Sequence, residues 1–199
     1  MRNNTSRQKI NQVTNRFLPL CPSVSQGYEP EPKFQDFTVL KEIGKGSFGK
    51  VYKVKQLSTG KIFAMKMVKK EKVKNESEEN KSILKEALIL RRLDHPNIMK
   101  IYEYFITDGY FYFIMEYVGG GELFEQLKKM NYYQESTASH IMKQIFSSVT
   151  YLHSMNIVHR DLKPENMMLV SENNMSIKLI DFGTANYVNP GQKLKLKIG

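Results

Sequence analysis

The most constraining stretch of this sequence lies near its C-terminal end. Residues 159–166 read HRDLKPEN, and Asp181, Phe182 and Gly183 follow after a short gap. Apolar, strand-like segments precede and separate these two runs, so the polar side chains fall in two short breaks between strands. These side chains are the carboxylate of Asp161, the ammonium of Lys163, the amide of Asn166 and the carboxylate of Asp181. Such a set of groups can hold a metal-bound triphosphate beside a hydroxyl group. We therefore interpret the upstream residues as the part of the chain that binds the rest of a nucleotide.

The overall composition is that of a folded, globular protein. The chain has 199 residues, of which 41% are hydrophobic and 11% aromatic, and this is enough for one domain with its own core. The single cysteine, Cys21, excludes an internal disulfide and fits a reducing compartment, so we expect a cytoplasmic protein, with the nucleus as an alternative. No run of about eighteen apolar residues occurs, so no membrane span is predicted.

The formal net charge of +10 raises the question of nucleic acid as a partner. The basic residues are spread along the chain rather than clustered, so we favour a solvated surface that also suits acidic ligands such as ATP. No nucleic-acid partner is predicted.

Residues 1–33 differ in composition from the rest of the chain. Before Glu29 they contain four basic residues and no acid, and the segment is rich in proline, asparagine and glutamine. This composition predicts a disordered basic tail, with a mitochondrial presequence as the alternative for an acid-poor segment that carries arginines.

A glycine-rich turn between two strand-like segments is the first motif of the folded part. Residues 44–49 read GKGSFG, and alternating apolar residues occur before them from Phe37 and after them from Val51. A dinucleotide-binding turn or a Walker A loop would lead into a helix, and a Walker A loop would place a hydroxyl side chain where Val51 stands. We therefore predict a β-hairpin whose glycines let backbone N–H groups approach phosphate oxygens, with Val51 covering a base.

Lys66 is the only charged residue in the segment 62–68, which is otherwise apolar on both faces. A lysine in such a strand needs an anionic partner. Between residues 76 and 93 apolar residues recur with helical spacing, and Glu86 lies on the same stripe. A carboxylate there is desolvated unless it is paired, so we predict an ion pair between Lys66 and Glu86; the alternative is a glutamate on the helix surface.

The middle of the chain completes the predicted sheet and leaves it through a glycine-rich segment. Residues 99–105 and 110–117 are predicted strands of a small antiparallel sheet. Three glycines follow at 119–121, as in a flexible joint between two lobes, with an ordinary glycine-rich loop as the alternative. A helix predicted over 135–153 carries an apolar stripe that must be buried.

A second hairpin is predicted from the segments 167–170 and 177–180. Both segments are short and mostly apolar, and polar turn residues separate them. This hairpin would bring Asp181 back beside Asn166 and so close a metal site.

Taken in order along the chain, these motifs resemble those of the eukaryotic protein kinases. The glycine-rich turn, Lys66 with Glu86, and the runs at 159–166 and 181–183 occur in the order of that family. Lys163 stands where the serine/threonine kinases have a lysine. The stretch from residue 37 onward is most similar to the calcium/calmodulin-dependent group, particularly the calcium-dependent protein kinases.

The resemblance implies an α+β, protein-kinase-like fold. Residues 34–118 would form an N-lobe, which is an antiparallel β-sheet with one helix. Residues 119–199 would form the first part of a mainly helical C-lobe, with the catalytic loop and the start of the activation segment. The implied activity is transfer of the γ-phosphoryl group of ATP, with Mg²⁺, to serine or threonine hydroxyls of protein substrates.

The resemblance also assigns catalytic and metal-binding roles. The implied catalytic residues are Asp161, Lys163, Lys66 and Glu86. Asp161 would accept the proton of the substrate hydroxyl, and Lys163 would neutralise the transferring phosphoryl group. Asn166 and Asp181 would be the oxygen ligands of Mg²⁺. His159 is the alternative general base because histidine titrates near neutral pH, but in the family the matching residue packs against Phe182.

The residues that match the family's nucleotide-binding positions are spread over both lobes. These ATP-binding residues are Ile43, Gly44, Lys45, Gly46, Ser47, Phe48, Gly49, Val51, Ala64, Lys66, Met115, Glu116, Val118, Glu122, Glu165 and Met168. In the family, Val51, Ala64 and Met168 would enclose the adenine, and Glu116 and Val118 would offer main-chain hydrogen bonds to it.

The resemblance also bears on substrates and on the extent of the chain. Glu122 and Glu165 resemble acids with which basophilic kinases read an arginine upstream of the target residue. The resemblance stops inside the activation segment, so we expect a C-terminally truncated kinase. The apolar stripe of the helix over 138–152 would then lack the helices that normally cover it, and such an exposed patch promotes aggregation or recruits a partner, so a regulatory partner could cover the incomplete C-lobe. If Gly199 is the natural end, we expect weak Mg-ATP binding and negligible peptide phosphorylation by the chain alone. The rival interpretation is a non-catalytic nucleotide-binding or scaffold fragment.

Overall fold

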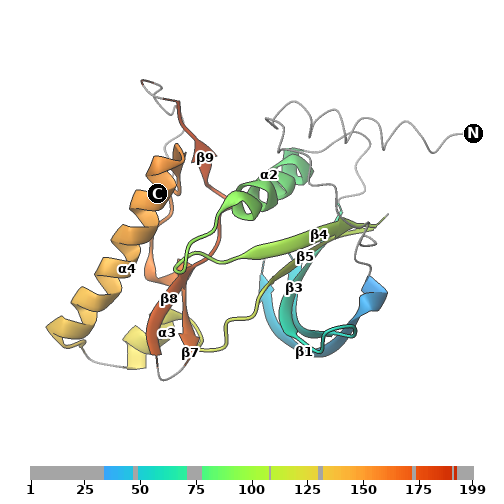
Figure 1. Cartoon of the computed structure of the whole chain (residues 1–199), viewed down its shortest axis with the longest axis horizontal. Helices are drawn as coiled ribbons and strands as arrows, with labels where there is room; N and C mark the ends of the chain where they lie inside the picture. The colour runs from blue at the N-terminus through green and yellow to red at the C-terminus, as the bar shows by residue number, and fades with distance from the viewer. Residues whose placement is uncertain are drawn as a thin grey trace, which may run out of the picture. The chain divides into compact units, whose positions relative to one another are not determined.

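The structure is a computed structural model that describes residues 34–46, 49–70, 78–107, 109–129, 132–171, 174–189 and 191 (Figure 1). The predicted tail at 1–33 and the predicted nucleotide-binding residues Ser47 and Phe48 lie outside the described residues. All of the described residues belong to one compact unit of the chain.

Five antiparallel strands form a sheet in the first half of the described chain (Figure 1). In sheet order the strands are β1 (Phe37–Gly46), β2 (Gly49–Gln56), β3 (Ile62–Lys69), β5 (Tyr110–Glu116) and β4 (Ile101–Ile106). The hairpin of β1 and β2 carries the glycine-rich turn, with Gly44 opposite Val51 and Gly46 opposite Gly49. The predicted hairpin is therefore confirmed, and the strand-to-helix units of the two rival motifs are excluded. A short 3-10 turn, η1 (Phe34–Asp36), precedes the sheet.

The sheet buries apolar side chains on both faces, as the two-sided apolar pattern of β3 requires. One face carries a core cluster of Phe37, Val54, Met65, Tyr112 and Ile114. On the other face, Val68, Phe111 and Phe113 belong to a larger cluster that includes residues of helix α2 (Glu78–Arg92). Lys66 lies on the α2 side of β3, because it is two residues from Val68 and alternate strand residues share a face.

Three α-helices occur in the described part of the chain. They are α2, α3 (Leu123–Lys129) and α4 (Glu135–Ser154). The bounds of α2 and α4 lie within about two residues of those predicted from the helical spacing of apolar residues. The helical spacing of apolar residues predicts both helices because each of them buries apolar side chains of one side in the core.

A second hairpin follows, as predicted. Its strands are β7 (Met167–Ser171) and β8 (Asn174–Leu179), and a 3-10 turn, η2 (Pro164–Asn166), leads into β7. A pair of two-residue strands, β6 (Ile157–Val158) and β9 (Asn186–Tyr187), was not predicted. Strands of this length leave no periodicity in a sequence, yet their pairing joins the two ends of the segment that carries the polar motifs.

The apolar stripe of α4 is buried along only part of its width. Ile141 and Leu152 are buried in the main core cluster. Met142 and Phe146 are instead 43% and 62% exposed. The expectation that the helices covering this side of α4 are missing is therefore confirmed for the described residues, because none of the described elements covers Met142 and Phe146.

The architecture is α+β, with an antiparallel sheet and one helix followed by a more helical part, as predicted. The division into lobes after residue 118 stays a prediction. Of the helices in the described ranges, none is both long and apolar enough to cross a membrane.

Candidate active site

Lys66 and Glu86 form the predicted ion pair between the sheet and helix α2. Lys66 Nζ lies 3.4 Å from Glu86 Oε1, and the two side chains are 24% and 17% exposed. Both residues line a small cavity together with Phe113 and Met115. The helix-surface alternative for Glu86 is therefore excluded, and the charge that interrupts the apolar strand is compensated by the helix that covers it.

The strand register places four predicted nucleotide-binding side chains on one face of the sheet. Val51 is directly opposite Lys66, and Ala64 is directly opposite Met115. Residues directly opposite in antiparallel strands point to the same face, as do residues two apart on one strand. Val51, Ala64, Lys66 and Met115 therefore share the face that carries the ion pair.

The linker, residues 116–121, runs along strand β7. Gly120 N–H donates to Leu169 O at 3.0 Å, and Leu169 N–H donates to Gly121 O at 2.8 Å. A Cβ atom on Gly120 would lie 2.6 Å from Leu169 O, so only glycine permits this approach. The predicted joint is thus bonded to the strand that carries Met168, one of the predicted adenine contacts.

In the predicted catalytic loop, residues 159–166, the polar side chains of Lys163 and Asn166 both contact Asp161. Asp161 Oδ2 accepts a hydrogen bond from Asn166 Nδ2 at 2.8 Å and lies 2.8 Å from Lys163 Nζ. Asn166 Nδ2 also donates to Asp161 O at 2.8 Å. Because the amide nitrogen of Asn166 makes both bonds, its amide oxygen is the atom that can ligate a cation.

Hydrogen bonding keeps Asp161 ionised. The hydrogen bond from Lys163 lowers the pKa of the Asp161 carboxyl, and the bond from Asn166 acts in the same direction. The same contact raises the pKa of Lys163. A carboxylate and an ammonium therefore stand side by side, so the loop offers a proton acceptor and a positive charge at one place.

Carboxylate oxygens of Asp181 and Glu86 both lie near Gly183, although the two residues are far apart in the sequence. A Cβ atom on Gly183 would lie 3.2 Å from Asp181 Oδ1 and 4.0 Å from Glu86 Oε2. Gly183 N–H donates to Asp181 Oδ1 at 3.1 Å. On the other side, Ile180 N–H donates to Asn166 O at 2.9 Å. The second predicted metal ligand is thus next to both the ion pair and the catalytic loop.

Left-handed backbone conformations occur at this site. Among the described non-glycine residues, Arg160, Asp181 and Asn156 have positive φ angles of 71°, 60° and 57°. Such conformations cost energy and persist only where surrounding contacts hold them. Arg160 Nε donates to Thr184 O at 2.7 Å, and Thr184 Oγ1 donates to His159 O at 2.8 Å. These bonds hold the catalytic loop and the segment after Asp181 together.

His159 is packed as the resemblance implied. Its ring centre lies 4.8 Å from that of Phe182 in a T-shaped contact, and its residue is only 3% exposed. Asp161 N–H donates to His159 Nδ1 at 3.3 Å, and burial lowers the pKa of the imidazole. A buried, neutral ring that accepts a main-chain bond supports the loop, and this favours Asp161 over His159 as the proton acceptor.

The remaining predicted nucleotide-binding residues come from β1 and β2, from the linker and from the segments next to or within β7. The exposed ones are Ile43, Lys45, Glu122 and Glu165. Glu122 forms an isolated bridge with Met168, and Val118 is buried. Their contact with a nucleotide stays a prediction.

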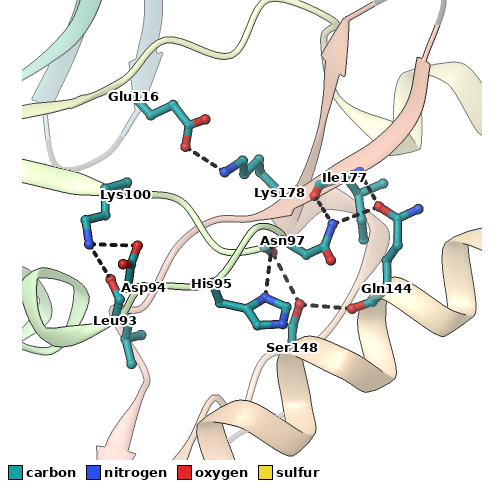
Figure 2. A network of polar contacts seen from close by, with 10 residues as sticks. All are labelled: Leu93, Asp94, His95, Asn97, Lys100, Glu116, Gln144, Ser148, Ile177 and Lys178. Atoms are coloured by element: carbon teal, nitrogen blue, oxygen red, sulfur yellow. Dashed lines mark hydrogen bonds and ion pairs between the residues drawn. The ribbon is translucent and has the colours of Figure 1, made fainter.

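A polar network joins the loop after α2 to the second half of the chain (Figure 2). Asn97 Nδ2 donates to Gln144 Oε1 at 2.8 Å and to Ile177 O at 3.0 Å. Ser148 Oγ donates to Asn97 O at 3.3 Å. Gln144 and Ser148 lie on α4, and Ile177 lies on β8. The loop that follows α2 is therefore bonded both to α4 and to β8, the strand that leads to Asp181.

One ion pair of this region was missed from the sequence. Lys178 Nζ, on β8, lies 2.8 Å from Glu116 Oε2, at the end of β5 (Figure 2). The signal was present, because Lys178 is the only charged residue in the apolar segment 177–180, as Lys66 is in its own strand. The rule that predicted a partner for Lys66 predicts one for Lys178 as well.

His95 makes the folding of this region sensitive to acid. Asn97 N–H donates to His95 Nδ1 at 3.1 Å, so Nδ1 carries no proton, and Nε2 lies 3.0 Å from Ser147 Oγ. Burial, followed by the charge of Lys178, lowers the pKa of His95 below its ordinary value of 6.5. A lowered folded-state pKa gives stability that is present above pH 6.5 and is lost as the pH falls through the folded-state pKa.

We therefore expect the free energy of unfolding to decrease on acidification below about pH 6.5, and His95→Gln to remove part of that decrease. Urea unfolding at a series of pH values measures it. His153→Gln, on the exposed end of α4, is the matched control and should keep the slope of the wild type. Equal slopes for His95→Gln and the wild type would contradict the prediction. Only part of the decrease is removed because burial also lowers the pKa of His159.

Comparison with known proteins gives the following matches. Residues 37–199 match the family described as protein kinase domain. The chain is 42% identical to calcium-dependent protein kinase 4 of Plasmodium berghei over 167 residues, which are 83% of this chain and 31% of that protein, and the Plasmodium falciparum protein of the same name matches to the same extent. It is 36% identical over 188 residues, 92% of this chain and 25% of the other, to "Probable serine/threonine-protein kinase fhkD" of Dictyostelium discoideum. The chain therefore spans about a third or less of the length of these relatives.

Proposed function

Because the chain belongs to the protein serine/threonine kinase family, we propose that it transfers the γ-phosphoryl group of Mg-ATP to serine or threonine hydroxyls of protein substrates. The observation that carries the proposal is the convergence at Gly183. A Cβ atom on Gly183 would lie within 4.0 Å of a carboxylate oxygen of Glu86 and of Asp181, and Asn166 of the catalytic loop accepts a hydrogen bond from Ile180 N–H, next to Asp181. A cytoplasmic location, with the nucleus as the alternative, is part of the proposal.

The residues of this chain divide the chemistry between them. Lys66, held by Glu86, places an ammonium where phosphates can bind, and Asp161 accepts the proton of the substrate hydroxyl as that oxygen attacks. Lys163 offers its charge to the transferred group. This work is mostly alignment and charge neutralisation, which suits a site built from fixed hydrogen bonds.

The oxygen donors of the site fit a hard divalent cation. Asn166 has its amide oxygen free of its bonds to Asp161, and Asp181 adds a carboxylate at the neighbouring strand end. Oxygen ligands of this kind suit Mg²⁺, which would neutralise charge on the phosphates.

The exposed acids Glu122 and Glu165 support a preference for substrates with basic residues. Both lie next to residues of the site, Glu122 through its bridge with Met168 and Glu165 in the turn that ends at Asn166. An arginine upstream of the target residue could pair with them.

The test is phosphate transfer from Mg-ATP by the full-length gene product. We expect transfer to a serine peptide with an upstream arginine, slower transfer when a glutamate replaces that arginine, and none when tyrosine replaces the serine. Mg-ATP binding without transfer to any peptide would instead favour a non-catalytic nucleotide-binding or scaffold protein.

A regulatory partner is a further part of the proposal. The exposed apolar side chains of Met142 and Phe146 on α4 offer a surface that such a partner would cover.

Replacing Lys66 by methionine is expected to weaken Mg-ATP binding about 10- to 100-fold. The change removes the ammonium and leaves the Glu86 carboxylate unpaired beside the phosphates. Titration of the 199-residue chain with a fluorescent ATP analogue measures the affinity. Lys61→Met, at an exposed position just before the same strand, is the control and should bind as the wild type does. Equal affinities for the two variants would count against the assigned role of Lys66.

A further inference from the structure

The linker is held by both strands of one hairpin. Its main chain is bonded to β7 through Gly120, Gly121 and Leu169. Its first side chain, that of Glu116, reaches Lys178 on β8 (Figure 2). Two different contacts therefore fix the two ends of the linker to the same pair of strands.

The same hairpin carries both predicted metal ligands. Asn166 immediately precedes β7, and Asp181 comes just after the end of β8. The two strand ends are joined by the hydrogen bond from Ile180 N–H to Asn166 O. The hairpin thus connects the linker, where adenine is predicted to bind, to the place where the phosphates and metal are predicted to bind.

The charges of the Glu116–Lys178 pair depend on each other. Lys178 is buried at 9% exposure, and Glu116 Oε2 is buried without a hydrogen bond of good geometry to any described residue. The ion pair at 2.8 Å is therefore what compensates both charges. Removing one partner leaves the other as an unpaired charge in a poorly solvated place.

The pair lies in the wall of a cavity of about 410 Å³ on this side of the linker. Tyr102 and His95 also line the cavity, as does a second ion pair between Lys100 and Asp94 at 3.0 Å. This second pair stays within the loop after α2 and the start of β4, so it does not join the linker to the hairpin. It provides a control with the same charge change in the same cavity.

We propose that Glu116 and Lys178 are a positioning pair that fixes the linker on the β7–β8 hairpin and so sets the distance between the adenine end and the metal end of the bound nucleotide. The fixing of the linker stands on the contacts alone, whereas its consequence for nucleotide rests on the proposed function. Neither side chain needs to touch the nucleotide, because Glu116 acts through its own main chain and Lys178 acts through Glu116.

Hydrogen–deuterium exchange of the nucleotide-free chain tests the first part. In Lys178→Met, the amides of Gly119, Gly120 and Leu169 should exchange about tenfold faster, because their bonds join the linker to β7. Amides that pair β2 with β3 should keep the rates of the wild type. Lys100→Met should leave the linker amides unchanged. If the exchange rates in Lys178→Met rose equally at all amides, or did not rise at the linker amides, the proposal would be overturned.

Ligand binding tests the second part. Lys178→Met and Glu116→Gln should each weaken the binding of adenosine and of Mg-ATP by a similar factor of about 3 to 30, with little effect on Mg-tripolyphosphate. The exchanged pair, Lys178→Glu with Glu116→Lys, should recover part of the affinity because it restores opposite charges at the two positions. A merely structural role would weaken the three ligands alike, and that result would overturn the positioning role.

The two proposals fail in different ways. A wild-type chain that bound neither adenosine nor Mg-ATP would refute the proposed function, and the exchange rates of the linker amides would still decide whether the pair holds the linker. A wild-type chain that bound both, with variants of equal affinity, would refute the positioning pair and leave the proposed function intact.

Discussion

Replacing Asp161 by asparagine is expected to slow phosphoryl transfer by about 10²- to 10⁴-fold while Mg-ATP binds with nearly unchanged affinity. Asp161 Oδ2 is the shared acceptor of the bonds from Asn166 and Lys163, and its ionised state follows from them. An asparagine has nearly the same shape and no carboxylate that could accept the proton of a substrate hydroxyl. The loss should therefore appear in kcat rather than in the affinity for nucleotide.

The measurement is the steady-state rate of peptide phosphorylation by the full-length product, together with nucleotide titration of the same variant. Glu125→Gln is the matched control, because Glu125 also pairs with a lysine, Lys128, at 2.8 Å, but on the exposed surface of α3. That variant should keep the wild-type rate. A rate for Asp161→Asn within about threefold of the wild type would show that the proton goes elsewhere.

The parts of the site that could be predicted from the sequence are those where a charge interrupts an apolar pattern. Lys66 interrupts β3 and Glu86 interrupts the buried stripe of α2, so each needs a partner, and helical spacing points Glu86 toward the sheet. The β1–β2 hairpin was predictable for a related reason, because Val51 continues a two-residue alternation where the rival motifs require a helix.

Other parts depend on packing between segments that are distant in the sequence. The pair of Glu116 and Lys178 joins the end of β5 to β8, and only the fold shows which acid lies within reach of Lys178. The close approach of Gly120 to β7 is of the same kind, since a run of glycines in a sequence does not distinguish a free joint from one bonded to a strand.

The partial burial of α4 shows a further limit of periodicity. The spacing of its apolar residues predicts which side of the helix is apolar, but it does not say how much of that side a neighbour covers. Ile141 and Leu152 face the core, whereas Phe146 lies on the same apolar stripe and is exposed. A pattern in one segment therefore predicts a need for burial, and the partner that meets the need has to be found in the structure.

Replacing Gly49 by alanine is expected to lower the free energy of unfolding by about 2–5 kcal/mol. Gly49 has a φ angle of +147°, and an added Cβ atom would overlap Met67 O and lie 3.1 Å from Val68 Cα. Both neighbours are main-chain atoms of β3, so they cannot turn aside as the end of a side chain can. The first residues of β2 would have to move away from β3, next to the place where Val51 faces Lys66.

Gly60→Ala separates this overlap from the strain of a positive φ angle alone. Gly60 has a φ angle of +70°, but its Cβ atom would meet only the flexible end of Lys55, at 3.6 Å, so a cost of about 1 kcal/mol is expected. Urea unfolding of both variants measures the difference. Because Met67 follows Lys66, Gly49→Ala should also weaken Mg-ATP binding under conditions where the variant is still folded, and Gly60→Ala should not. Equal losses of stability in the two variants would mean that β2 and β3 separate at little cost, and that the hairpin does not hold the glycine-rich turn against the strand of Lys66.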